Sequence, residues 1–260
     1  LKRSTLRSGQ KPAMAGLACH VSLRNCGKNR LFLSVNPNTL TMIHALLLIL
    51  YVGMAYLLGS IPTAVWLGKR LYHVDVREHG SRNAGATNTI RVLGIRIGLA
   101  VLAIDVAKGF AAVQLARLAP WLLPGDWALD LLRIGLGLAA FFGHLFPVFA
   151  QFKGGKGVAT LLGVVLALEP LAALSALGVF ALTLTVTRYV SLGSMLAGLS
   201  FPLFAYFAYG ERSVPMIVFN VMLALLLLYT HRANIKRLSQ GEESRFTPTR
   251  HGSAGGQTNS

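Results

Sequence analysis

The segment FKGGKGVATL, at residues 152–161, lies between two long apolar runs and carries the residue types that bind phosphate. Backbone N–H groups at the start of a helix are free to bind an anion, and glycines let a phosphate approach them closely. The charged and small residues of the segment are Lys153, Gly154, Gly155, Lys156 and Gly157. The GxxxxGK[ST] spacing of nucleotide-binding loops is absent, and a basic anchor for lipid headgroups would use the same residues. Phosphate binding and membrane anchoring both remain open for this segment taken alone.

A second polar segment, VREHGSRNAGATNTIRVLG at residues 76–94, favours phosphate binding. Its candidate anion-binding residues are Ser81, Asn83, Thr87, Asn88 and Arg91. The planar guanidinium of an arginine holds a phosphate through two parallel hydrogen bonds. Short polar side chains also form turns and helix caps, and for Thr87 or Asn88 taken singly a turn or cap is the expected role.

Two charged residues, Asp105 and Lys108, lie three positions apart inside an apolar run and therefore on one helical face. Each charge costs about 2.5–3.5 kcal/mol at the centre of a membrane helix, so we expect the two to pair inside a bundle. A purely structural pair fits this pattern, and so does a site near a basic loop in which Lys108 binds phosphate and Asp105 has a structural role.

The last polar segment, HRANIKRLSQGEE at residues 231–243, places His231 and Asn234 one helical turn apart. A histidine in this setting acts as a general base or as a phosphate ligand. We expect Glu243, near the end of the segment, to hold a basic residue of a neighbouring loop.

The elements that carry these segments are membrane-spanning helices. Hydrophobic residues make up 53% of the 260 positions and charged residues only 13%, about half the charged fraction of a soluble domain. The apolar runs lie near 43–67, 95–119, 131–150, 158–168, 171–187, 195–210 and 213–230. The run from 158 to 168 counts separately because Pro170 follows it and proline disrupts a helix interior. The sequence therefore predicts an all-α integral membrane protein, a bundle of about seven transmembrane helices.

The basic residues predict the orientation of this bundle. With seven spans, one face holds Lys69, Arg70, Arg77, Arg82, Arg91, Arg96, Lys153, Lys156, Arg188, Arg232, Lys236, Arg237, Arg245 and Arg250. The other face holds only Arg117, Arg133 and Arg212. Because lysine and arginine accumulate in cytoplasmic loops, we expect the N-terminus outside and the C-terminus in the cytoplasm. All the polar segments described above then meet on the cytoplasmic face.

The net charge of +16 points to an anionic partner, for which lipid headgroups and phosphorylated small molecules are the best candidates. Nucleic acid is excluded because the basic residues sit in short loops and form no aromatic platform. Neither Cys19 nor Cys26 has a partner at metal-ligand spacing, so we predict no metal site and no cofactor.

The two ends of the chain differ from the middle in composition. Residues 1–41 are basic, contain no acid and no long apolar run, and precede a start-like Met42. We expect 1–41 to be a disordered or mis-assigned extension, 42–245 to be the transmembrane domain, and 246–260 to be a disordered polar tail.

Taken together, the motifs resemble those of the bacterial acyl-phosphate:glycerol-3-phosphate acyltransferase family. They are GSIPT (59–63), GSRNAGATN (80–88), RVLG (91–94), DVAKG (105–109), GHLFPVFAQFKGGKGVAT (143–160), SLGS (191–194) and HRANIKRLSQGEE (231–243). The match covers about 42–245 with all motifs in order. The resemblance implies a seven-span enzyme of the bacterial inner membrane with its active site in the cytoplasm. It implies transfer of an acyl group from acyl phosphate to the 1-hydroxyl of glycerol 3-phosphate, giving lysophosphatidate and inorganic phosphate.

Carried over to this sequence, the family's essential serine and arginine fall on Ser81 and Arg91, and its last motif places a histidine and an asparagine at His231 and Asn234. The phosphate loop falls on 154–157, and the structural glutamate falls on Glu243. The His-x4-Asp signature of thioester-using glycerolipid acyltransferases is missing from the chain. The resemblance therefore implies acyl phosphate as the donor, in place of acyl-CoA or acyl carrier protein.

Two other classes of protein have basic inner loops of this kind. A small transporter for an anionic solute would use glycine-broken helices, but no inverted repeat is visible here. A scaffold that only binds lipid would tolerate alanine at Ser81 and Arg91, since neither residue anchors a span. Oligomeric state and acyl-chain preference have no signal in the sequence.

Overall fold

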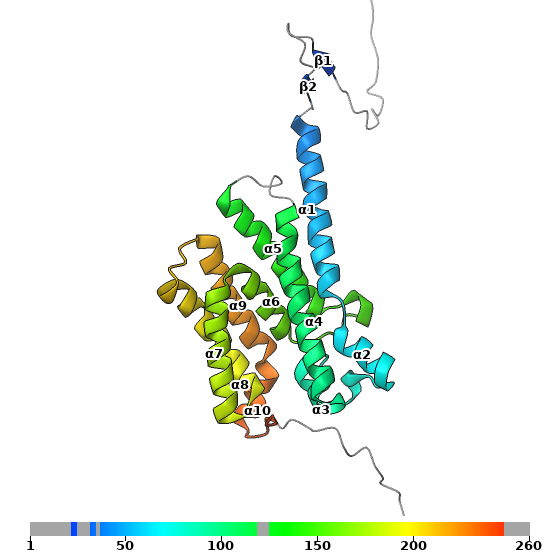
Figure 1. Ribbon diagram of the computed structural model, residues 1–260, viewed down its shortest axis with the longest axis vertical. Helices are drawn as coiled ribbons and strands as arrows, with labels where there is room; N and C mark the ends of the chain where they lie inside the picture. The colour runs from blue at the N-terminus through cyan, green and yellow to red at the C-terminus, as the bar shows by residue number, and fades with distance from the viewer. Residues whose placement is uncertain (1–21, 25–31, 35–36, 119–124, 247–260) are drawn as a thin grey trace, which may run out of the picture. The chain divides into compact units, whose positions relative to one another are not determined.

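The structure is a computed structural model that describes residues 22–24, 32–34, 37–118 and 125–246 (Figure 1). The chain divides into two compact units, 1–47 and 48–260, and each is considered by itself. In the first unit, β1 (Ser22–Arg24) pairs antiparallel with β2 (Phe32–Ser34), and α1 (Pro37–Gly59) begins. The rest of the predicted extension, with Cys19 and Cys26, and the tail from 247 to 260 lie outside the described residues.

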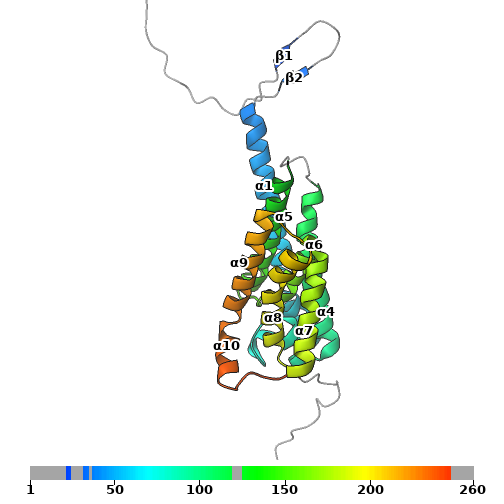
Figure 2. The ribbon, with the colours of Figure 1, turned by 90° about the vertical axis from the view of Figure 1, so that its left-hand side faces the viewer.

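In the described part of the second unit every regular element is a helix. After α1 the elements are α2 (Thr63–Tyr72), η1 (Val76–Glu78), α3 (Ala86–Leu93), α4 (Ile95–Gln114), η2 (Leu115–Leu118), α5 (Asp126–Leu145), η3 (Val148–Ala150), α6 (Val158–Leu168), α7 (Pro170–Thr187), α8 (Val190–Leu203), the π-helical turn η4 (Phe204–Ala208), α9 (Val214–Thr230) and α10 (Arg232–Ser239). Neighbouring helices in the sequence pack against each other, so that α7, α8 and α9 lie side by side (Figure 2). The predicted all-α class is confirmed.

Within the described residues, five helices are long and apolar enough to cross a membrane: α1, α4, α5, α7 and α8 with η4. A sixth span results if α9 and α10, which meet at an angle of 58°, are counted together. Helix α6 is apolar but extends for only about 16 Å, half the thickness of the hydrocarbon core. The protein is therefore an integral membrane protein that crosses the bilayer several times.

Two predicted breaks in the helices have different outcomes. The break before Pro170 is confirmed, because α6 ends at Leu168 and α7 begins with the proline. The prediction of one span over 43–67 is wrong, because α1 ends at Gly59 and a separate helix begins at Thr63. Pro62, at the N-cap of α2, has no N–H to continue the ladder of α1 and favours a new helix start.

Glycines let the helices around the site approach closely. A Cβ on Gly163 of α6 would lie 1.9 Å from the Val106 carbonyl oxygen, and one on Gly109 of α4 would lie 2.1 Å from that of Thr160. Since no real Cβ tolerates such a distance, α4 and α6 are in direct backbone contact at these positions. This contact fixes α6, and with it the loop that precedes α6.

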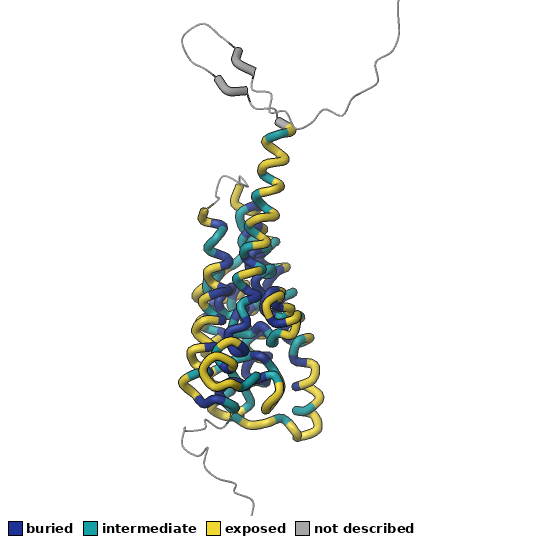
Figure 3. The backbone as a smooth tube through the Cα atoms, turned by 90° about the vertical axis from the view of Figure 1, so that its right-hand side faces the viewer, coloured by how far each residue is buried: buried dark blue, intermediate teal, exposed yellow. Residues whose placement is uncertain are grey.

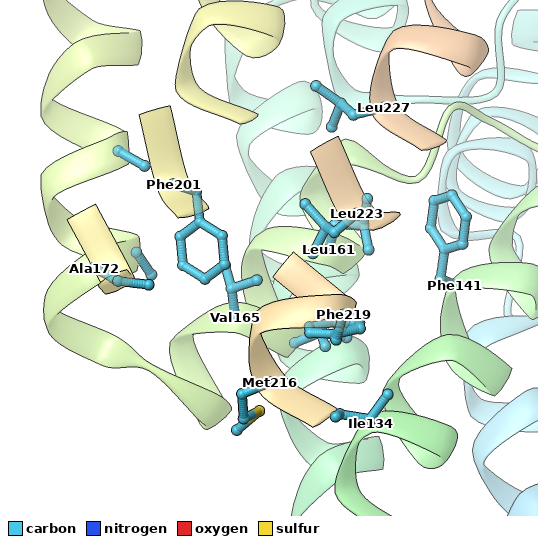
Figure 4. Close-up of a cluster of buried hydrophobic side chains, with 14 of the residues drawn as sticks. Ile134, Phe141, Leu161, Val165, Ala172, Phe201, Met216, Phe219, Leu223 and Leu227 are labelled. Carbon is cyan, nitrogen blue, oxygen red and sulfur yellow. The ribbon is translucent and has the colours of Figure 1, made fainter. Parts of the chain in front are cut away.

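Apolar side chains fill the interior between α5, α6, α7, α8 and α9 (Figure 4). Its largest fully buried members are Phe141 and Phe219. Exposed residues lie along the outer faces of the helices (Figure 3), and many of them are large and apolar, as expected where lipid is the solvent. The glycine-rich loop, α3 and α10 carry the polar segments, and Figure 1 shows α3 and α10 at the same end of the bundle.

Candidate active site

A single cavity of about 1020 Å³ collects most of the predicted site residues. Its polar end is formed by the loop before α3, the loop before α6, the α9–α10 junction and the segment after α10. Its apolar arm runs between α6, α7, α8 and α9. The predicted site residues that line it are Ser81, Asn83, Thr87, Asn88, Arg91, Asp105, Lys156, Gly157, His231, Asn234 and Glu243.

Four predicted residues do not line this cavity: Lys108, Lys153, Gly154 and Gly155. Lys153 is exposed on the loop surface. The Lys108 ammonium lies 2.9 Å from Asp105 Oδ1 and donates to the Ile61 carbonyl at 2.9 Å. The predicted pairing of Asp105 with Lys108 is therefore present. The Lys108 ammonium, a phosphate ligand in the sequence-based prediction, is instead bound by Asp105 and the Ile61 carbonyl.

The loop that presents Ser81 is held in shape by Asn88. The Asn88 side chain accepts from the Ser81 N–H at 2.8 Å and donates to the carbonyls of Val76 and His79 at 2.7 and 3.1 Å. Asn88 is buried while Ser81 is exposed to the cavity. Asn88 therefore serves the structure of the loop, as expected for this residue type in a turn.

The glycine loop presents Lys156 from the opposite wall. Gly157, at the N-cap of α6, has φ +78°, and a Cβ there would strike the Phe141 ring at 2.3 Å. The Lys156 ammonium donates to Asn234 Oδ1. Burial lowers the pKa of Lys156 to about 8, with Glu243 opposing this effect and the cations of Arg237 and Arg91 adding to it. Lys156 is therefore largely protonated at neutral pH and loses its charge as the pH rises through about 8.

Glu243 binds three neighbouring side chains at the polar end of the cavity. Its carboxylate accepts from Ser191 Oγ at 2.7 Å, from Asn234 Nδ2 at 2.6 Å and from Arg237 Nε at 2.8 Å. Burial raises the pKa of Glu243, but these hydrogen bonds lower it more, so the carboxyl stays ionised. Asn234 thus bridges Glu243 and Lys156. The basic residue that Glu243 contacts directly is Arg237 of α10, and Ser191 is its partner on α8.

His231 and Arg91 complete the polar end. The Nδ1 atom of His231 lies 2.9 Å from the Leu227 carbonyl oxygen, which only accepts, so Nδ1 donates and the neutral ring keeps its lone pair on Nε2. The residue is buried and lines the cavity. Arg91 donates to the Ser244 carbonyl at 3.2 Å, which ties α3 to the segment after α10.

The apolar arm begins directly beyond these polar groups. Its lining comprises Leu161, Leu162, Val165, Ala173, Ala176, Leu177, Phe180, Leu184, Ala197, Gly198, Phe201, Leu223 and Leu227. On α8 the lining extends from Val190 to Phe201, about 17 Å along the helix. The cavity therefore has a cationic end that continues into an apolar slot, and this slot runs along most of the length of α8.

Sequence reasoning missed His144, Ser191, Arg237 and Arg245, which also line the cavity. His144 and Ser191 lie inside motifs that were recognised. His144 lies within the apolar run 131–150 and Ser191 in the short segment between two runs, and neither position gave a chemical signal. Arg237 and Arg245 were counted only as basic residues of the inner face.

Cations that converge on one end of an apolar slot, inside a bundle of membrane-spanning helices, define a membrane enzyme of phosphorylated lipids. The family model for glycerol-3-phosphate acyltransferase matches residues 48–241. The glycerol-3-phosphate acyltransferase of Trichlorobacter lovleyi is 47% identical over 196 residues, which cover 75% of this chain and 96% of that protein. The enzyme of the same name from Chlorobaculum parvum is 42% identical over 220 residues, with 75% and 95% covered.

Two crystal structures of PlsY (YgiH), an integral membrane glycerol 3-phosphate acyltransferase, resemble this fold. The glycerol 3-phosphate form has a TM-score of 0.68 at 41% identity, covering 77% of this chain and 96% of that chain. The lysophosphatidic acid form has a TM-score of 0.66, covering 77% and 95%. The chain therefore belongs to the glycerol-3-phosphate acyltransferase family, as its motifs predicted. It is an integral membrane acyltransferase of phospholipid synthesis.

Proposed function

We propose that the protein transfers a fatty acyl group from acyl phosphate to the 1-hydroxyl of sn-glycerol 3-phosphate. The hydroxyl oxygen bonds to the acyl carbonyl carbon, the bond from that carbon to the phosphate oxygen breaks, and inorganic phosphate and lysophosphatidate leave. The related PlsY structures were obtained in glycerol 3-phosphate and lysophosphatidic acid forms, in keeping with this acceptor and this product.

The observation that carries the proposal is the union of cations and an apolar slot in one cavity. Both substrates bear phosphate, so two anionic groups must be held close together. Arg91, Lys156, Arg237 and Arg245 line the polar end and offset this repulsion, while the slot receives the acyl chain. Acyl phosphate is already activated, so positioning and charge stabilisation suffice and a covalent acyl-serine is not required.

The residues of the polar end have distinct roles in this proposal. Ser81 donates a hydrogen bond to a phosphate or to the developing oxyanion, and Arg91 and Lys156 bind the phosphates. Asn234 holds the Lys156 ammonium, and Glu243 holds Asn234. The shorter side chains of Asn83 and Thr87 supply further hydrogen bonds. Lys153 serves headgroup contact and Lys108 serves helix packing, while Gly154, Gly155 and Gly157 let the backbone approach.

The proton of the acceptor hydroxyl has a nearby receiver in His231. Its Nε2 carries the lone pair, because Nδ1 donates to the Leu227 carbonyl. The leaving phosphate is the other receiver of the right basicity. The His231→Ala variant distinguishes these two proton acceptors. If the acidic limb of its pH–rate profile were unchanged, His231 would be excluded as the titrating base.

We further propose seven spans, α1, α4, α5, α6, α7, α8 and α9, with the N-terminus outside and the polar end of the cavity in the cytoplasm. The short α6 crosses together with the turn at Glu169, whose carboxylate accepts from Asn220 at 3.0 Å. Residues 42–245 form the catalytic domain in this proposal, and the bacterial inner membrane is its location. The strong bias of basic residues to one face supports this orientation.

A donor comparison on the detergent-solubilised full chain tests the activity. Labelled glycerol 3-phosphate is supplied with either palmitoyl phosphate or palmitoyl-CoA, and lysophosphatidate is measured. We expect product from palmitoyl phosphate alone, and its loss in Ser81→Ala. Product from palmitoyl-CoA would refute the assignment of the donor, and no product from either donor with folded protein would refute the proposed reaction.

A further inference from the structure

A buried polar cluster lies behind the glycine loop and has no role in the mechanism above. Asp105 and Lys108 of α4 are 1% and 5% exposed. Asp105 Oδ1 accepts from Thr63 Oγ1 at 3.0 Å and lies 2.9 Å from the Lys108 ammonium. Lys108 also donates to the Ile61 carbonyl, so the pair joins α4 to the start of α2. Because a buried ion pair stabilises a fold no better than a packed apolar pair, its presence calls for another explanation.

His144, at the end of α5, forms the side of the cluster that faces the cavity. The residue is 7% exposed, and its Nδ1 lies 3.8 Å from Asp105 Oδ1, close to the carboxylate but beyond hydrogen-bond distance. Both His144 and Asp105 line the cavity. Within the described part of the chain, the His144 ring makes no hydrogen bond.

The glycine loop is built directly on His144. The Gly155 N–H donates to the His144 carbonyl at 3.3 Å, and the Gly154 N–H donates to the Leu145 carbonyl at 3.2 Å. A Cβ on Gly155 would lie 2.4 Å from His144 Nε2 and 2.9 Å from the Ala84 carbonyl oxygen. Gly155 therefore packs between the His144 ring and the loop that carries Ser81, and there is no room for a side chain at this position.

Lys156 follows Gly155 directly, and its ammonium reaches Asn234 across the cavity. Any shift of Gly155 against the His144 ring therefore moves the cation. We infer that His144, whose ring lies between Asp105 and Gly155, is a positioning residue that sets the place of Lys156 in the cavity. The inference rests on the proposed role of Lys156 in binding phosphate.

A double-mutant cycle between the two positions tests this inference on the full chain. The variants are His144→Ala, Lys156→Met and the double variant, with kcat/KM measured for both substrates. Since small displacements of a binding group cost up to about a hundredfold in rate, we expect His144→Ala to lower kcat/KM at least about tenfold. In the Lys156→Met background the same change should cost less than about twofold, because the group on which His144 acts is gone.

Controls separate positioning from loss of the fold. Phe142→Ala removes an exposed ring two residues away on α5 and should leave kcat/KM unchanged in both backgrounds. If His144→Ala does not yield folded protein, His144→Gln keeps a polar side chain of similar size and enters the same cycle. Equal losses from the His144 variant in both backgrounds would overturn the inference. If the Lys156→Met enzyme were as active as the wild type, the proposed role of Lys156 in phosphate binding would be refuted. The packing of the glycine loop against His144 would not be affected by that result.

Discussion

At the scale of single residues, Lys156 is the group whose charge depends most directly on the assay conditions. Burial lowers its pKa to about 8, so the ammonium is largely protonated below this pH and largely neutral above it. Phosphate binding needs the protonated form. We therefore expect kcat/KM to fall as the pH rises through about 8, while the substrate phosphates keep their charge because their second pKa is about 6.

The Lys156→Arg variant is the matched control for this pH dependence, because a guanidinium stays protonated over the whole range. The kcat/KM of this variant should be lower than that of the wild type at neutral pH, because the larger, planar guanidinium does not reproduce the contact of the Lys156 ammonium with Asn234. Its profile should lack the decline near pH 8. A wild-type profile that is flat from about pH 7 to about pH 10 would contradict the assignment.

Glu243 organises neighbours instead of binding substrate, and this difference has a measurable consequence. Glu243→Ala removes the acceptor of Ser191, Asn234 and Arg237 at once. Losing a charged hydrogen-bond partner costs about 1.5–3 kcal/mol, so we expect a fall in kcat/KM of about tenfold or more. Ser191→Ala, which removes only one of the three contacts, should cost clearly less. Equal losses in steady-state assays of the two variants would show that the Asn234 contact is unimportant.

At the scale of elements, the contact of α4 with α6 determines where the glycine loop ends and α6 begins. Gly163→Ala would bring a methyl group within 1.9 Å of the Val106 carbonyl oxygen, so the helices must separate. Overpacking of this kind costs about 1–3 kcal/mol, and we expect a lower apparent melting temperature in detergent. Gly178 of α7 has nothing within 4 Å of its Cβ position, so Gly178→Ala should leave the melting temperature unchanged or raise it. Equal destabilisation by both variants would argue against direct backbone contact.

The apolar arm leads to a prediction about acyl-chain length. Phe201 of α8 lies in the buried apolar cluster (Figure 4). Of the residues of that helix that line the cavity, it is the farthest along the chain from Ser191. Phe201→Ala lengthens the slot, so we expect the preference among acyl phosphates of increasing chain length to move toward longer chains. Leu199 is exposed on the same helix and does not line the cavity, so Leu199→Ala is the control. An identical chain-length profile for the two variants would place the end of the slot elsewhere.

The sequence predicted the elements of this fold better than their contacts. Hydrophobic runs and Pro170 were sufficient to place the helices α4 to α9, because length and apolar character decide which segments enter a bilayer. The error at 43–67 arose because Pro62 interrupts an apolar run that hydropathy alone reads as continuous. Ser81, Arg91 and His231 stood out as polar residues in loops. His144 did not, since the packing of its ring against Gly155 is a contact between distant segments that no periodicity records.

At the scale of the whole molecule, the helix count and the charge distribution support each other. If α6 crosses together with its turn at Glu169, five crossings separate the start of α5 from α10. The start of α5 and α10 then lie on opposite sides of the membrane. The side of α10, which carries most of the basic residues, is the cytoplasmic side. If α6 does not cross, both places face the same side. The orientation of the active site thus depends on one short helix.

Cysteine labelling distinguishes the two arrangements. In a chain with Cys19 and Cys26 replaced by serine, Asp126→Cys places a thiol at the exposed start of α5, and Ser239→Cys places one at the exposed end of α10. A maleimide that does not cross membranes should label the thiol at position 126 in intact spheroplasts, and the one at position 239 only after permeabilisation. Retained acyltransferase activity in each variant shows that the fold is intact. Labelling of both thiols under the same condition would mean that α6 does not cross, and the proposed count of seven spans would be wrong.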